Sequence, residues 1–97
     1  MKRAYVISYD LKGPSANYSD LYEFLKSQEN WWHYLASTWI IISDLSASAL
    51  ADEIRRYTKE GDRFLVTSLT KETNGWLPKR AWDWIHEKLD RVVALQS

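Results

Sequence analysis

The run Trp39-Ile40-Ile41-Ile42 limits the fold of this chain more than any other feature, because all four side chains are large and apolar. Successive side chains of a strand point to opposite faces, so a strand with one face in water alternates apolar and polar residues. This run does not alternate. It therefore predicts a strand, over Thr38 to Ser43, in a sheet that is covered on both faces.

The rest of the chain predicts the order strand, helix, strand, strand, helix, strand, followed by an added C-terminal helix. Period-two and apolar patterns place the other strands at residues 4–10, 31–35 and 63–70. The alternative is that residues 31–35 and 38–43 form one strand bent at Ala36-Ser37. Helices are expected after an Asn17 cap, after a Ser46 cap and from Pro78. This is the ferredoxin-like βαββαβ order. We expect an α+β fold of that kind, with one domain over residues 1–97.

Two helices can cover only one face of such a sheet, so the other face needs a second cover. The C-terminal helix, with its stripe of Trp82, Ile85 and Leu89, can supply part of it. A second copy packed sheet to sheet can supply the rest. We expect a homodimer, and the alternative is a monomer with the third helix folded across the sheet.

Composition excludes several classes of protein. The 13 basic and 13 acidic residues balance to zero, which excludes general polyanion binding through bulk charge. No cysteine is present, so there is neither a disulfide framework nor a thiolate metal site. No apolar run reaches the ~18 residues of a membrane helix, and the N-terminus does not resemble a signal peptide. We expect a cytoplasmic protein that does not enter a membrane.

Asp10 is the first candidate for chemistry, because it ends the first strand and precedes a Gly13-Pro14 loop. One carboxylate binds Mg²⁺ or Mn²⁺ poorly, since such ions prefer several oxygens. A second Asp10 across a two-fold axis, with Ser8 on the same strand face, would make a shared metal site. The alternative is that Asp10 accepts hydrogen bonds from the amides of its own loop.

Five further residues are candidates for catalysis or substrate binding. His33 is a candidate general base, although a histidine among aromatic residues can also be purely structural. Lys12 is a candidate for holding a phosphate group. Trp76, Lys79 and Arg80 form a second candidate for a phosphate or nucleotide contact, since exposed tryptophans stack bases and cations are unexpected at a helix start.

Five segments of the chain carry a resemblance to a known family: Arg3 to Leu11, Asn17 to Leu21, Trp31 to Leu35, Ser37 to Ile41 and Gly75 to Pro78. They resemble the small "SinR-like" proteins. These belong to a ferredoxin-like group that includes the small subunit of the CRISPR spacer-integration complex and the virulence-associated D toxins. The resemblance implies a homodimer with facing sheets, in which the aspartate matching Asp10 lies at the dimer cleft and supports metal-dependent cleavage of RNA or DNA.

Two functions are therefore expected. The first is a metal-dependent endonuclease with Asp10 at the metal and Ser8 and His33 as helpers. The second is a catalytically silent dimer that binds a nucleotide, cyclic or short oligonucleotide, or a protein partner in phage–host or toxin–antitoxin conflict. The nucleases of the group often carry arginines soon after the aspartate, whereas Lys12 is the one cation that follows Asp10 closely here. This difference favours the second function. The expected fold and the position of Asp10 agree with the first, and the endonuclease is the function that we expect, with the binding module as the alternative.

Overall fold

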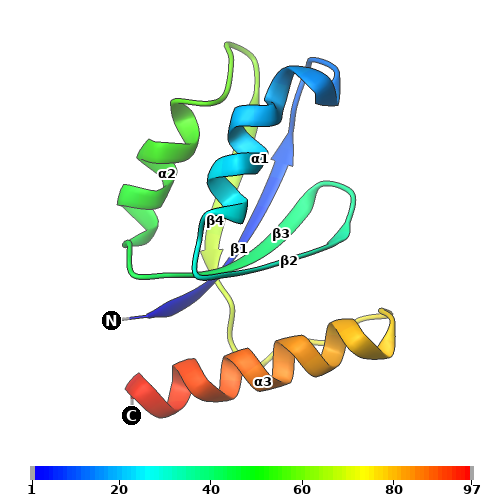
Figure 1. Cartoon of the computed structure of the whole chain (residues 1–97), viewed down its shortest axis with the longest axis vertical. Helices are drawn as coiled ribbons and strands as arrows, with labels where there is room; N and C mark the ends of the chain where they lie inside the picture. Colours follow the sequence, from blue (N-terminus) through cyan, green and yellow to red (C-terminus); the bar gives the residue numbers. More distant parts are fainter. Residues whose placement is uncertain (1, 97) are drawn as a thin grey trace.

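The computed structural model describes residues 2–96, with side chains up to residue 92. Four strands, three α-helices and a short 3₁₀ helix follow one another along the chain (Figure 1). In order they are β1 (Arg3–Asp10), η1 (Ser15–Tyr18), α1 (Ser19–Lys26), β2 (Asn30–Leu35), β3 (Thr38–Ser43), α2 (Ala47–Arg55), β4 (Arg63–Ser68) and α3 (Lys79–Gln96).

The strands form one antiparallel sheet in the order β2-β3-β1-β4, so β1 and β3 are central. The predicted mixed α+β fold with strands at these places is confirmed. The register sets Ser8 of β1 between Thr38 of β3 and Leu65 of β4. Residues that are paired in this way point to the same face of the sheet.

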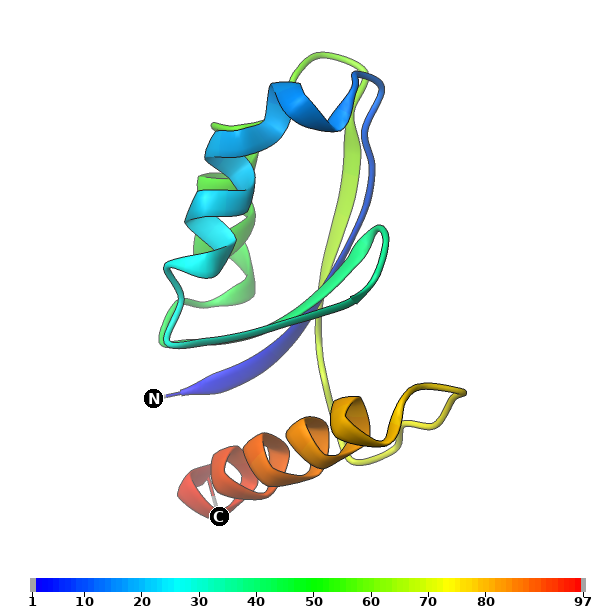
Figure 2. The same ribbon diagram turned by 45° about the vertical axis from the view of Figure 1, so that its right-hand side comes forward.

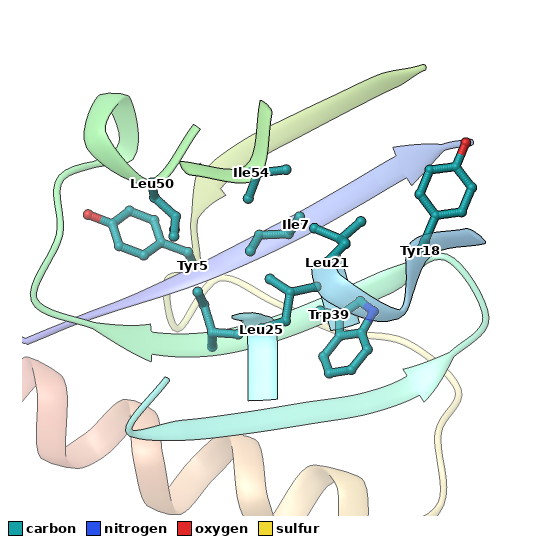
Figure 3. Close-up of a cluster of buried hydrophobic side chains, with 9 residues drawn as sticks. Tyr5, Ile7, Tyr18, Leu21, Leu25, Trp39, Leu50 and Ile54 are labelled. Carbon is teal, nitrogen blue, oxygen red and sulfur yellow. The ribbon is translucent and has the colours of Figure 1, made fainter. Parts of the chain in front are cut away.

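Helices α1 and α2 pack against one face of the sheet (Figures 1 and 2). Tyr5 and Ile7 of β1 and Trp39 and Ile41 of β3 point into this layer, as the alternation along the strands predicts. Large aromatic side chains supply much of the buried area that a short chain needs. Figure 3 shows the helix side chains that meet them, which are Tyr18, Leu21, Leu25, Leu50 and Ile54.

Helix α3 lies on the opposite face, where it crosses one end of the sheet (Figure 2). Its side chains enter two clusters there. Every residue from Trp39 to Ser43 is buried, so the predicted cover on both faces of this strand is confirmed. Within residues 2–96 no helix, α3 included, is long and apolar enough to cross a bilayer. The clusters consist of Ala4, Ile42, Leu89 and Val92, and of Trp32, Ile40, Ala81 and Ile85.

The rest of that face has no helix over it (Figure 2). It carries the end of β1 and the start of β4. The Leu65 side chain there is 63% exposed, and Asp10 and Thr67 are exposed as well. This part of the sheet, with Ser8, Asp10, Arg63 and Leu65 on one face, is called the open end below.

Three local details differ in how well the sequence predicted them. Ser46 caps α2 by accepting a hydrogen bond from the Ala49 amide at 3.1 Å, as expected. The predicted Asn17 cap is wrong, because Asn17 lies inside η1, where its amide bonds the Pro14 carbonyl at 2.9 Å. The Trp32 ring is buried, and its Nε1 donates to the Ala81 carbonyl at 3.3 Å.

Candidate functional site at the open end of the sheet

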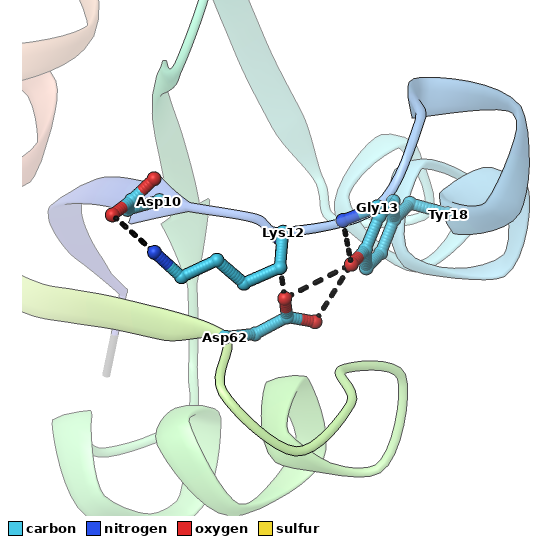
Figure 4. A network of polar contacts seen from close by, with 5 residues as sticks. All are labelled: Asp10, Lys12, Gly13, Tyr18 and Asp62. Atoms are coloured by element: carbon cyan, nitrogen blue, oxygen red, sulfur yellow. Dashed lines mark hydrogen bonds and ion pairs between the residues drawn. The ribbon is translucent and has the colours of Figure 1, made fainter.

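Asp10 is the last residue of β1, and its side chain is 72% exposed. The Lys12 ammonium lies 3.6 Å from its Oδ2 and is itself exposed (Figure 4). Ion pairs in such exposed places hold weakly, because water competes for both charges. Both groups are therefore accessible to a ligand.

Arg63 adds a second cation that the sequence analysis missed. The antiparallel pairing of β1 and β4 sets Arg63 directly opposite Asp10, so the two side chains start on the same face of the sheet. Arg63 is exposed. A carboxylate thus stands at the open end with Lys12 following it and a guanidinium on the neighbouring strand, although no arginine follows Asp10 closely in the sequence.

Ser8 lies one step back along β1 on the same face as Asp10. Its hydroxyl is 3.2 Å from the hydroxyl of Thr38 on β3. The two groups hydrogen-bond to each other, and Ser8 remains partly accessible. The structure therefore brings Ser8 and Asp10 to one surface, as the alternation predicts.

Asp62 holds the loop that follows Asp10 (Figure 4). Its carboxylate accepts the Lys12 amide at 2.8 Å, the Lys59 amide at 2.7 Å and the Tyr18 hydroxyl at 2.9 Å. The Gly13 amide donates to the same Tyr18 oxygen at 3.1 Å. These bonds fix the backbone from which the Lys12 side chain reaches Asp10.

The same contacts shift two pKa values in opposite directions. The Lys12 amide, followed by the Lys59 amide and the Tyr18 hydroxyl, lowers the pKa of Asp62. Burial raises the pKa of Tyr18, and the negative charge of Asp62 acts in the same direction. The network therefore contains an ionised carboxylate and a neutral phenol at neutral pH.

His33 lies on the other face of the sheet from Asp10. Its ring stacks on Trp39 with centroids 4.0 Å apart, and its Nε2 is 3.2 Å from the Ala36 carbonyl oxygen. Trp39 belongs to the layer under α1 and α2. The structure does not bring His33 together with Ser8 and Asp10, and its contacts fit the structural alternative.

The second predicted group lies at the start of α3 and in the loop before it. Trp76 is fully exposed. Lys79 pairs with Asp83 at 3.0 Å, one helical turn further on. The Arg80 guanidinium lies over the Tyr34 ring, 5.5 Å from its centroid. These contacts account for two cations at a helix start, where they are otherwise unfavourable.

One copy of the chain offers a metal ion a single carboxylate at the open end. Among the residues that the structure describes, no three His, Cys, Asp or Glu side chains gather in a way that could hold a metal. Mg²⁺ is commonly bound through one or two carboxylates, with waters and substrate phosphates completing its shell. One Asp10 is the smallest such set, and a second Asp10 from another copy would raise it to two carboxylates.

A shallow pocket of about 300 Å³ adjoins Asp10 on the side of α1. Three tyrosines, Tyr9, Tyr18 and Tyr22, line it together with Gly13. Its volume is at the lower end of the range for small-ligand sites. Aromatic walls next to exposed charges suit a base attached to a phosphate.

Comparison with protein-family models, curated proteins and solved structures finds no significant match to the chain. The geometry of the open end is therefore the basis for a functional proposal, with the resemblance in the sequence motifs beside it.

Proposed function

We propose that the chain is a metal-dependent endonuclease that cleaves RNA or DNA as a homodimer, with Asp10 at a site shared by two copies. One observation carries this proposal. An exposed carboxylate stands at the open end of a central strand, with the exposed Lys12 pairing with it and Arg63 on the neighbouring strand. The order of elements and strands is in keeping with the ferredoxin-like plan expected from the sequence.

The chemistry follows from the charge that develops on the phosphorus centre. Attack on a phosphodiester places extra negative charge on the non-bridging oxygens. Lys12 and Arg63 would bind and orient the phosphate and balance part of this charge. Asp10 would be the protein ligand for Mg²⁺ or Mn²⁺, which, when bound, activates a water molecule and stabilises the leaving oxygen.

The apolar side chain exposed at the open end supports a homodimer, because a second copy could cover it. Leu65 is the most exposed large apolar side chain within the strands and shares its face with Ser8 and Asp10. A second copy packed against the open end would bury Leu65. A two-fold axis close to it would bring the two Asp10 carboxylates together.

The test is cleavage of fluorescent RNA and DNA with Mg²⁺, Mn²⁺ or EDTA. Asp10→Asn should lower the cleavage rate by about 100-fold or more, because one group that acts on the transition state is lost. Asp52→Asn, an exposed acid on α2, is the matched control and should cleave like the wild type. Cleavage that persists in EDTA, or in Asp10→Asn, would contradict the proposal.

The tyrosine-lined pocket beside Asp10 favours a second candidate, a catalytically silent dimer that binds a nucleotide or a short cyclic oligonucleotide. Such a ligand needs few cations, in keeping with the zero net charge. Thermal unfolding with a panel of mono-, di- and cyclic nucleotides tests it, because a bound ligand raises the midpoint. A panel without any effect would count against this candidate.

A further inference from the structure

Beyond Lys79, which pairs with Asp83, the charges of helix α3 lie in an acidic stripe and a basic stripe. Acidic residues recur on the side away from the sheet at positions 83, 87 and 90, and a basic and aromatic stripe recurs at 80, 84, 88 and 91. Residues three and four apart lie on one face of a helix. The basic stripe flanks the buried positions Ala81, Ile85 and Leu89. It therefore lies beside the sheet.

The basic stripe borders β2, an edge strand of the sheet. At one end Arg80 lies over the Tyr34 ring. At the other end Lys88 and Arg91 line a small hollow together with Asn30, the first residue of β2. The α3–β2 strip is the name used below for Tyr34, Arg80, Trp84, Lys88 and Arg91.

Tyr34 is the aromatic platform of this strip. Its side chain is 40% exposed, and its ring packs against the buried Trp32 with centroids 5.1 Å apart. Trp32 and the Arg80 guanidinium hold this partly exposed ring in place, so it can contact a base at little cost in conformational entropy. Arg80 beside it supplies a planar cation that can stack or bind a phosphate.

Two arginines of the strip, Arg80 and Arg91, can bind a phosphate without first breaking an ion pair. Among the described residues, neither Arg80 nor Arg91 forms an ion pair with an acidic side chain. Lys88 lies 3.8 Å from Glu87. Lys2 and Glu29 pair with each other at the rim of the hollow. The two arginines are therefore the cations of the strip that a phosphate chain meets first.

We infer that the α3–β2 strip binds single-stranded nucleic acid, with phosphates on Arg80 and Arg91 and a base stacked on Tyr34. The combination of aromatic rings with a line of cations is typical of single-strand binding. The stripe from 80 to 91 is about 16 Å long, at 1.5 Å per residue. It would hold a few nucleotides. The inference rests on the proposed function for its choice of polymer, and it places a guiding surface away from the cleavage site.

Fluorescence anisotropy with 5′-labelled T₈ and U₈ oligonucleotides, in EDTA at low and moderate salt, tests the strip without any cleavage. Tyr34→Leu should weaken binding about fivefold or more, because one stacking contact is lost. Tyr34→Phe keeps the ring and should bind like the wild type. Replacing Arg80 and Arg91 by Gln should reduce the salt slope by about 1.4, the value for two phosphate contacts on a single strand.

A double variant at the end of α2, Arg55→Gln with Arg56→Gln, removes the same charge from another surface. It should leave binding unchanged. Wild-type protein that binds neither oligonucleotide, or Tyr34→Leu that binds as the wild type does, would overturn the inference and leave the strip to a protein partner. Asp10→Asn should still bind, so loss of cleavage and loss of strand binding are separate results.

Discussion

The two faces of the sheet are built differently. Under α1 and α2, apolar side chains such as Ile7 and Ile41 are completely buried. On the other face α3 buries Ile40 and Ile42 but stops short of the open end, where Leu65 is 63% exposed. The first face holds the larger cluster of buried apolar side chains. The second combines a stabilising half with a half on which Asp10 and its neighbouring cations are accessible.

The largest expected effect compares two leucines, one from each environment. Leu25→Ala should lower the free energy of unfolding by about 2–5 kcal/mol, because it empties part of the closed layer. Leu65→Ala should change it by less than about 0.5 kcal/mol, measured on the dilute monomer. Urea denaturation measures both.

The comparison fails if both variants lose similar stability in dilute solution. That result would mean that Leu65 is covered within a single chain, and the open end would not exist. Circular dichroism of both variants before denaturation checks that the native helices and strands are retained.

A smaller effect is expected for the network that holds the loop behind Asp10. Asp62→Asn should unfold at a lower temperature than the wild type at pH 7, because the ionised carboxylate accepts two amides and a hydroxyl. The pKa of Asp62 is lowered in the folded chain, so this stability is present above the unfolded pKa of about 3.9 and is lost as the pH falls below it.

Thermal unfolding from pH 7 to pH 2.5 follows the difference between the two proteins. We expect the gap to be constant from pH 7 to about pH 5 and to close towards acid. A gap that widens as the pH falls would contradict the role assigned to the carboxylate. Asp52→Asn, on the exposed side of α2, should show a much smaller gap throughout.

The local parts of this fold could be predicted from the sequence. The apolar run at residues 39–42 required cover on both faces, and the alternation along β1 placed Ser8 and Asp10 on one face and Ile7 on the other. The Ser46 cap followed from its residue type and position. Each of these depends on neighbours in the chain, where the periods of strands and helices apply directly.

The features that the sequence did not reveal, or revealed wrongly, depend mostly on contacts between distant segments. Arg63 stands opposite Asp10 only because β4 pairs with β1, and Asp62 looks like any exposed acid after a glycine until it meets the Lys12 amide. His33 was grouped with Asp10 because the faces of separate strands cannot be related before their register is known. Asn17 failed as a cap because the turn begins earlier, at Pro14.

The central claim is that the open end is a meeting surface between copies, with an Asp10 from each. Light scattering on the wild type and on Leu65→Asp tests it most directly, with Ser48→Asp on the exposed start of α2 as the control that adds the same charge. The account predicts a mass of twice 11.5 kDa for the wild type and the control, and 11.5 kDa for Leu65→Asp. A monomeric wild type, or a dimer that survives Leu65→Asp, would contradict it.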